Sequence, residues 1–473
     1  MDIITGKFLK LNNWPDGKII GLAKDLGNKL IGNGMDRDAA LSKLEAVRQS
    51  PGSFLADPSC ANLARECIRV TQKNEPSTTD LRKAPLPFPI WGVENIDKGA
   101  IQQMENAMRL PVTVTGALMP DAHVGYGLPI GGVLATDNVV IPYAVGVDIA
   151  CRMRLSLYEV SPILMGQKKG LFEDALWNET AFGMGVKWTG AKRAQHAVLD
   201  DSAWDATRQL RTLKDIAYGQ LGTSGTGNHF VEWGSFRLHE PMFGLKPGEY
   251  LALLSHSGSR GVGAKIADRY SKLAMEKHPD LDKSVRHLAW LPLDSEDGQE
   301  YWLSMELAGR FASANHYIIH HRVAAALGLK EAAVVENHHN FAWVQKLTAG
   351  RNVIVHRKGA TPAGAGVLGV IPGSMGDAGY VVRGRGVGES LESASHGAGR
   401  LMSRTAALNS ISRNARDEYL KERGVTLLGG GLDESPQAYK PIDTVILAQQ
   451  DLVDVIGKFA PRIVRMADEP GDI

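Results

Sequence analysis

An acid and a thiol, Asp148 and Cys151, stand three residues apart inside the apolar run of residues 143–155. A buried carboxylate without compensation costs several kcal/mol, so it pairs with a cation, shifts its pKa or binds a metal ion. An acid and a thiol so close together favour the metal ion. The alternative is that Asp148 caps a helix after a strand and that Cys151 is an ordinary core residue.

Histidines further along the chain can complete a site for metal and phosphate. Asn228 and Glu232, which both follow a glycine loop, share a face whether the segment is a helix or a strand. His256 ends an apolar strand and precedes a turn of small residues that carries Arg260, where a phosphate can approach backbone N–H groups. The residues alone give a candidate site of one acid, one thiol and four histidines: Asp148, Cys151, His229, His256, His339 and an exposed His396.

Other motifs are excluded by their spacing. His316 and His320, at i and i+4 of a helix expected over residues 312–327, look superficially like a zinc helix. The metalloprotease form requires a Glu directly after the first His, and residue 317 is a tyrosine, so we expect a packed or solvated face. The sequence contains no Walker A motif and no G-x-S-x-G motif, which argues against a P-loop nucleotidase and an α/β-hydrolase.

The composition is that of an ordinary globular protein. Of 473 residues, 44% are hydrophobic and 22% are charged, while 52 glycines predict many tight loops. Because the net charge is only +1, a polyanion must be met by a local basic patch. Three cysteines without framework spacing fit a reducing compartment. With no signal-peptide pattern and no long apolar run, we expect a cytoplasmic protein that makes no use of a membrane.

We expect an N-terminal segment and one catalytic unit. Residues 1–84 are predicted to be mostly helical, with helices over residues 35–48 and 61–72, and to pack on the core. The proline-rich stretch that follows keeps the backbone extended and outside any helix. Residues 85–473 are therefore expected to form the catalytic unit.

Glycine-rich stretches adjoin several candidate side chains. From residue 119 a glycine-rich loop, with Asp121 and His123 at its head, is expected to enter an apolar strand. A basic cluster that includes Lys358 ends another expected strand. His396 lies among residues too small to shield it.

Read together, these segments resemble the RtcB family of RNA ligases from about residue 120 to residue 440. The segments are P-D-A-H-V-G-Y-G, V-G-V-D-I-A-C, G-T-S-G-T-G-N-H-F, H-S-G-S-R-G, H-H-N, H-R-K-G-A-T, P-G-S-M-G and H-G-A-G-R. The resemblance implies an α/β fold in which β-sheets flanked by helices surround one deep metal site. It also implies that RNA ends with a 2′,3′-cyclic phosphate or 3′-phosphate are joined to 5′-hydroxyl ends, using GTP and two manganese ions. The implied partners are RNA, GTP and an archease-like activator.

The resemblance assigns roles residue by residue. His396 would be the histidine that is guanylylated, and Lys358 would contact phosphate. Cys151 would bridge the two ions within the metal set Asp148, Cys151, His229, His256 and His339. The guanine nucleotide and its phosphates would be bound by Asn228, Glu232, Ser374, Met375, Tyr439, Gly397, Ala398, Gly399 and Arg260.

Two other functions compete with ligation. A metal-dependent phosphodiesterase that opens cyclic phosphates would need the metal set but not His396. A noncatalytic RNA-end binding protein would be expected to have lost a ligand or the nucleophile, and this sequence has lost neither. A thiolate with three imidazoles also suits zinc, which the Irving–Williams order ranks above manganese, so manganese follows from the resemblance alone.

The C-terminal stretch departs from the family pattern. Many family members end in Lys-Gly, and the resemblance implies that this lysine reaches the guanine nucleotide. Met466 stands where the lysine would be. A thioether cannot donate a hydrogen bond, so we expect the neighbouring Arg465 to reach in instead, with a plain surface cation as the alternative.

Overall fold

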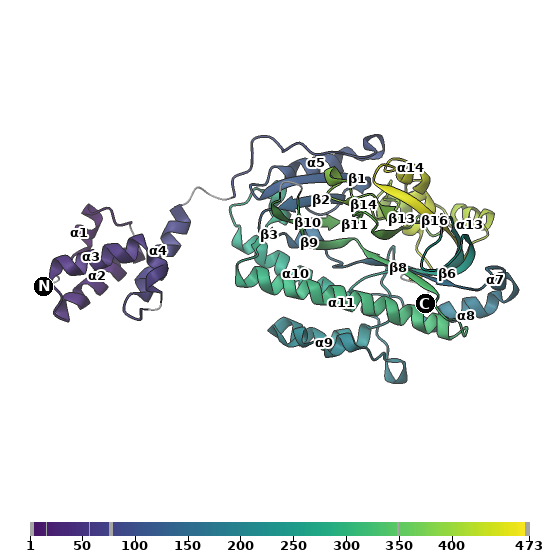
Figure 1. Ribbon diagram of the computed structural model, residues 1–473, viewed down its shortest axis with the longest axis horizontal. Coiled ribbons are helices and arrows are strands. Elements are labelled where there is room, and N and C mark those ends of the chain that lie inside the picture. Colours follow the sequence, from purple (N-terminus) through teal and green to yellow (C-terminus); the bar gives the residue numbers. More distant parts are fainter. Residues whose placement is uncertain (1–3, 16, 56, 75–78, 348–349, 469–473) are drawn as a thin grey trace. The chain divides into compact units, whose positions relative to one another are not determined.

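The computed structural model describes residues 4–15, 17–55, 57–74, 79–347 and 350–468. The chain divides into two compact units, Met1–Asp80 and Leu81–Ile473. Figure 1 shows the elements of both units. Among the described residues, none of the helices combines the length and the apolar character that a membrane span requires.

The first unit is helical. Its helices are α1 (Gly6–Leu11), α2 (Lys18–Gly32), α3 (Arg37–Gln49) and α4 (Ala61–Asn74). Thr5 and Asp36 cap α1 and α3, because their side-chain oxygens accept backbone N–H groups of the first turn. Apolar residues at helical spacing, including Leu26, Leu44 and Leu63, form a core of its own. The two helices predicted in this segment are therefore present.

The second unit is built around a large antiparallel sheet, in which one short strand, β15, pairs in parallel with β16. Its strands follow the order β12-β13-β16-β5-β6-β4-β8. Their bounds are β12 (Leu368–Ile371), β13 (Gly379–Gly384), β16 (Val453–Met466), β5 (Phe230–Leu238), β6 (Gly248–Ser257), β4 (Arg152–Tyr158), β8 (Ala333–His338) and β15 (Thr426–Leu428). Every residue of β4 is buried, which means that both faces of the sheet are covered here.

A second sheet has four strands in the order β1-β2-β10-β9. Their bounds are β1 (Thr113–His123), β2 (Ile130–Thr136), β10 (Asn352–Lys358) and β9 (Asn340–Lys346). Two small sheets pair β11 (Ala360–Pro362) with β14 (Ser393–Ser395) and β3 (Val139–Val140) with β7 (Leu291–Pro292). Asp121 and His123 therefore lie at the end of a strand, and the glycine-rich loop begins after them rather than before.

Helices cover the sheets. The longest, α11 (Glu296–Ala325), runs beside α10 (Arg260–Lys277) along one side of the sheets, with α9 (Arg208–Gln220) beyond it (Figure 1). The other helices are α5 (Lys98–Met108), α6 (Pro142–Val145), α7 (Ile163–Gln167), α8 (Lys169–Glu179), α12 (Arg404–Ser410), α13 (Arg413–Glu422) and α14 (Ile442–Leu447). The predicted α/β class is confirmed.

Candidate active site

Four of the predicted metal ligands lie at one edge of the large sheet. The strands β5, β6, β4 and β8 are neighbours and antiparallel, so the starts of β5 and β4 lie beside the ends of β6 and β8. His229 and Cys151 each precede a strand, His256 lies near the end of β6, and His339 follows β8. Side chains that are far apart in the sequence are therefore brought together by the strand order.

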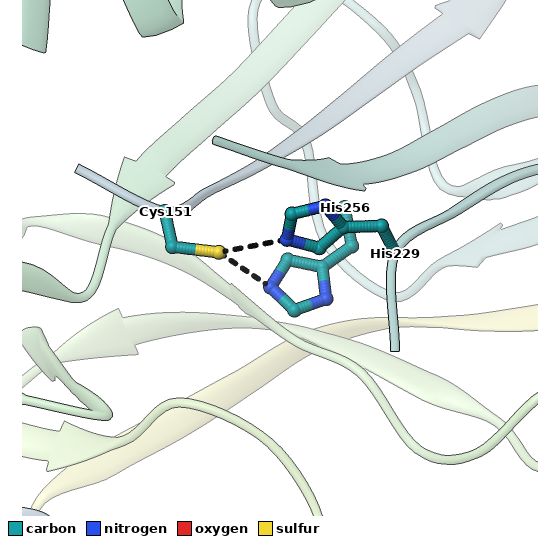
Figure 2. Close-up of side chains that lie close together, drawn as sticks. All are labelled: Cys151, His229 and His256. Atoms are coloured by element: carbon teal, nitrogen blue, oxygen red, sulfur yellow. Dashed lines mark hydrogen bonds between the residues drawn. The ribbon is translucent and has the colours of Figure 1, made fainter. Parts of the chain in front are cut away.

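The thiol and the imidazoles converge on one point. The Sγ atom of Cys151 lies 3.1 Å from Nε2 of His256 and 3.5 Å from Nε2 of His229, and both contacts are drawn in Figure 2. The Nε2 atoms of His256 and His339 are 3.3 Å apart. The Cys151, His229 and His256 ligand atoms all lie within 4.8 Å of one another, and all three residues are buried. This grouping of donors is suited to a metal ion.

The hydrogen bonds around the Cys151, His229, His256 and His339 cluster leave donor atoms that could bind a cation. Nδ1 of His256 lies 2.9 Å from the backbone oxygen of Asn228, which can only accept, so Nδ1 carries the proton. The lone pair of Nε2 is then directed toward the sulfur and toward His339. Burial lowers the pKa of His256 and of His339 well below the ordinary value, so both rings are neutral. A metal ion would accept the lone pair of His256 Nε2 and, by displacing the thiol proton, the sulfur of Cys151 as well.

The fifth predicted ligand, Asp148, adjoins the cluster through His229. Its Oδ2 lies 3.1 Å from Nε2 of His229, and although burial opposes ionisation, the hydrogen bond to His229 holds the pKa of Asp148 below its usual value. Asn340 donates to the backbone oxygen of Asp148 at 3.1 Å and so fixes the loop. Gly258 is required opposite, because a Cβ at that position would overlap with the Asp148 carboxylate. Burial, followed by the Asp148 charge, raises the pKa of the Cys151 thiol, so a cation would be needed to hold the thiolate.

A buried polar network supports the strands from the side of α11. The hydroxyl of Ser255, the residue before His256, lies 2.7 Å from Nδ1 of His316 and 2.8 Å from Nε2 of His320. Arg152, the residue after Cys151, is 2.9 Å from Nδ1 of His338, the residue before His339. His316 and His320 on α11 therefore form a packed face, as expected, and they are not part of the cluster of candidate metal ligands around Cys151.

His396 is held at its Nδ1 side. Nδ1 lies 2.6 Å from Oδ2 of Asp121, and the same oxygen accepts the backbone N–H of His396 at 3.1 Å. The ring of His396 is 4.8 Å from the ring of His339, measured between centroids. Its side chain is only 14% exposed, so the expectation of an exposed histidine is wrong. The walls of a cavity account for the difference.

That cavity has a volume of about 750 Å³, which suits a nucleotide-sized ligand. His256 and His396 both line it, which joins the metal cluster to the candidate nucleophile. It is also lined by most of the residues predicted to bind the nucleotide: Asn228, Ser374, Met375, Gly397, Ala398, Gly399 and Tyr439. The hydroxyl of Tyr439 donates to Glu434, and burial raises the pKa of Tyr439 well above its usual value.

Two predicted nucleotide residues do not line this cavity. Glu232 is buried on β5, where its Oε2 has no hydrogen-bond partner and burial raises its pKa well above the usual value. Arg260 lies in a second cavity of about 510 Å³, which Asp148 and His229 also line. Its Nε donates to the hydroxyl of Thr223 at 3.1 Å. The metal cluster therefore borders two cavities, and Arg260 belongs to the second.

Arg465 points away from the cavity, and the expected replacement of a lysine by this arginine is contradicted. Successive residues of a strand face opposite sides. Met466 lines the cavity, whereas Arg465 bonds Asp468 at 2.9 Å and lies over Trp177, with 4.2 Å between its guanidinium carbon and the ring centroid. The cavity is therefore lined at this position by the thioether of Met466.

Sequence reasoning missed residues that the geometry places at the site. Asp121 was seen only as the head of a loop, although it holds His396. Arg400 lines the cavity and donates to Glu434 at 3.2 Å, and Arg404 lines it as well. The H-G-A-G-R segment contains Arg400, so the signal for that residue was present. No local signal links Asp121 to His396, because 275 positions separate them.

The fold and the site define an α/β protein with a buried thiol–imidazole cluster beside a histidine held by a carboxylate. A family model described as tRNA-splicing ligase RtcB matches residues 103–467. The chain is 34% identical over 412 residues to the RNA-splicing ligase RtcB of Escherichia coli K12, covering 78% of this chain and 95% of that protein. It is 31% identical over 440 residues to the tRNA-splicing ligase RtcB of Thermococcus kodakarensis, covering 76% and 89%. The chain belongs to the RtcB family.

Proposed function

We propose that this protein is an RNA ligase that joins 3′-phosphate or 2′,3′-cyclic phosphate ends to 5′-hydroxyl ends through a His396–GMP adduct. The observation that carries the proposal is that His396, which Asp121 binds, lines one cavity together with His256 of the Cys151 cluster. The relatives named above as RNA-splicing ligases support the same activity. A cavity of about 750 Å³ has room for a nucleotide next to the nucleophile.

The first step belongs to His396. Because Asp121 can only accept while ionised, the Nδ1 proton of the imidazole stays between the two residues, and Nε2 keeps a lone pair. Nε2 attacks the α-phosphorus of GTP, the bond from that phosphorus to the bridging oxygen breaks, and pyrophosphate leaves. The ring becomes more positive as the bond forms, and the carboxylate of Asp121 stabilises that charge.

The next steps return His396 to its free state. An oxygen of the RNA 3′-phosphate attacks the phosphorus of the adduct, so GMP passes to the RNA and Nε2 is released with its lone pair. The 5′-hydroxyl oxygen of the second RNA then attacks the RNA phosphorus, its proton passes to solvent, and GMP leaves. A cyclic phosphate must be opened by water before it can take part. Activation by GMP replaces a poor leaving group with a good one.

The ligand set proposed for the metal is Cys151, His229, His256, His339 and Asp148, the residues that converge at the sheet edge. A bound ion would supply charge stabilisation for the phosphate oxygens during in-line displacement. We assign two manganese ions to this set on the strength of the family resemblance. The donors themselves would also hold zinc.

Nucleotide recognition is proposed for the cavity wall. Gly397 and Ala398 follow His396 in the chain and line the cavity, and their backbone N–H groups would bind the phosphates. Ser374, Met375 and Tyr439 would form the base and ribose side of the same cavity. Asn228 would adjoin the metal cluster, since its backbone oxygen already orients His256. Glu232 would need to turn toward the cavity to take part.

The test is a joining assay with two short RNAs, one ending in a 3′-phosphate or, in a parallel reaction, a 2′,3′-cyclic phosphate, and one beginning with a 5′-hydroxyl. With GTP and manganese we expect joined RNA, and without GTP we expect none. A cyclic phosphodiesterase would open a 2′,3′-cyclic end with metal alone and would never yield joined RNA. An opened cyclic end without any joined RNA would overturn the proposal.

A further inference from the structure

Part of the lining of the His396 cavity has no role in the nucleotide assignment, and this part includes the wall next to the loop that follows β1. This wall consists of Asp97, His123, Val124, Tyr126 and Ile130. Apart from Asp97, this wall begins two residues after Asp121, which binds His396, so it adjoins along the chain the residue that holds the nucleophile. If GMP passes from His396 to an RNA 3′-phosphate, the RNA end has to enter this same cavity. This wall is one surface available to the RNA end, and the segment of residues 400–404 is another.

The wall displays an aromatic ring. Tyr126 is 73% exposed although it lines the cavity, and Val124 beside it is 54% exposed. The other aromatic residues that line the cavity, Phe230 and Tyr439, are buried or half-buried. A tyrosine ring presented in this way offers an apolar face with little cost in side-chain entropy on binding.

The loop that carries the ring is fixed by its backbone. The Nζ of Lys358 donates to the backbone oxygen of Tyr126. The side chain of Gln103 both donates to the oxygen of Gly125, at 2.5 Å, and accepts its N–H, at 3.0 Å. Gly127 has a φ of +72° and lies against His287, whose ring meets Tyr126 edge-on at 6.5 Å between centroids. The ring is therefore held at a set position while its face stays free.

We propose that the ring of Tyr126 stacks on the terminal nucleobase of the RNA strand that carries the 3′-phosphate. The inference rests on the proposed ligase function and names where that substrate binds. Every nucleobase has a π-face, and Val124 and Ile130 present no hydrogen-bonding groups, so the contact is tolerant of sequence. Stacking holds the terminal ribose and its phosphate beside His396.

The experiment measures binding of a fluorescent 3′-phosphate RNA by anisotropy, without GTP, for strands with a normal or an abasic terminal nucleotide. The wild type is expected to prefer the normal strand by roughly 5- to 150-fold, the range for base–aromatic stacking. Tyr126→Ala is expected to bind both strands alike, and Tyr126→Phe, which keeps the ring, to retain the preference. Tyr317→Ala is the matched control, because this tyrosine is 44% exposed but does not line the cavity.

Two results would overturn the proposal: a preference that persists in Tyr126→Ala, or equal binding of both strands by the wild type. A second RNA carries its abasic nucleotide at the 5′-hydroxyl end instead of the 3′-phosphate end. If the wild type loses affinity for this RNA and not for the first, the proposal is also overturned. The binding titration keeps the test separate from the ligase function. A wild-type protein that stacks the terminal base but joins no RNA would contradict the proposed function and leave the Tyr126 contact standing.

Discussion

The Oδ2 atom of Asp121 lies 2.6 Å from Nδ1 of His396 and also accepts the backbone N–H of the same histidine at 3.1 Å. One carboxylate oxygen therefore fixes both the ring and the backbone of the candidate nucleophile. Lys440 supports this arrangement, because its Nζ donates to the backbone oxygens of Pro120 and Ala122 at 3.0 and 2.9 Å. The carboxylate, the ring and the supporting ammonium come from three separate segments of the chain.

Asp121→Asn is expected to slow formation of the protein–GMP adduct by roughly 100-fold or more, the range for loss of a positioned acid–base partner. An amide can donate to Nδ1, which would move the ring proton to Nε2 and remove the attacking lone pair. Single-turnover adduct formation at saturating GTP measures the effect, with metal content determined on the same sample. An adduct rate within twofold of the wild type would show that Asp121 does not set the tautomer.

Cys151→Ala and His256→Ala are each expected to lose bound metal and joining activity while the protein stays folded. A methyl group cannot replace the sulfur on which two imidazoles converge. Elemental analysis with circular dichroism checks both variants. Cys67→Ala is the matched control, since Cys67 is a buried, free cysteine in the core of the first unit. Full metal occupancy in Cys151→Ala would exclude the cluster as the metal site.

The stability of the protein is expected to fall in acid, in part through His356. Nε2 of this buried ring accepts the N–H of Ile141 at 2.9 Å, and Nδ1 lies 3.1 Å from the oxygen of Leu134. Burial lowers the pKa of His356 from 6.5 to about 4. The unfolded chain binds the proton more tightly, so this contribution is complete above pH ~6.5 and is lost as pH falls toward 4. At pH 5 the loss is roughly 2 kcal/mol.

Urea unfolding of the wild type and His356→Gln at pH 7 and pH 5 measures this contribution. The variant carries no titrating ring, so the difference in unfolding free energy between the two pH values is expected to shrink. His321→Gln, at an exposed position of α11, is the matched control. Equal pH dependence in all three proteins would remove His356 from the account.

The sequence indicated which side chains lie close together better than it indicated the contacts between them. His256 and His339 were singled out because apolar strands were expected to end there, Cys151 because of its spacing from Asp148, and His229 because it follows a glycine loop. All four lie at strand termini, and neighbouring antiparallel strands place such termini at one edge. The pairing of Asp121 with His396 depends on how two distant segments pack, and no local pattern encodes that packing. The same limit explains why His396 was expected to be exposed.

The C-terminal strand shows a second limit. Arg465 was expected in the cavity because it stands next to Met466, but the pairing of Met466 with Phe230 fixes which residue faces the site. A one-residue shift would have reversed every side chain of β16, and register is a property of the paired strands rather than of one segment.

Arg465→Ala is therefore expected to lower the free energy of unfolding and to leave nucleotide use unchanged. The loss of its contact with Trp177 and of its bonds to Asp468 should amount to roughly 1–3 kcal/mol. Adduct formation across GTP concentrations checks the second part. A tenfold rise in the GTP concentration needed for half-maximal adduct would return Arg465 to the nucleotide site.

The central claim is that His396 takes GMP from GTP, and radiolabelled GTP tests it most directly. Wild-type protein incubated with α-labelled GTP and manganese should retain label after denaturation. The label should be lost in acid and kept in base, as expected for a phosphorus–nitrogen bond, and His396→Ala should retain none. Label that survives acid, or that persists in His396→Ala, would contradict the account.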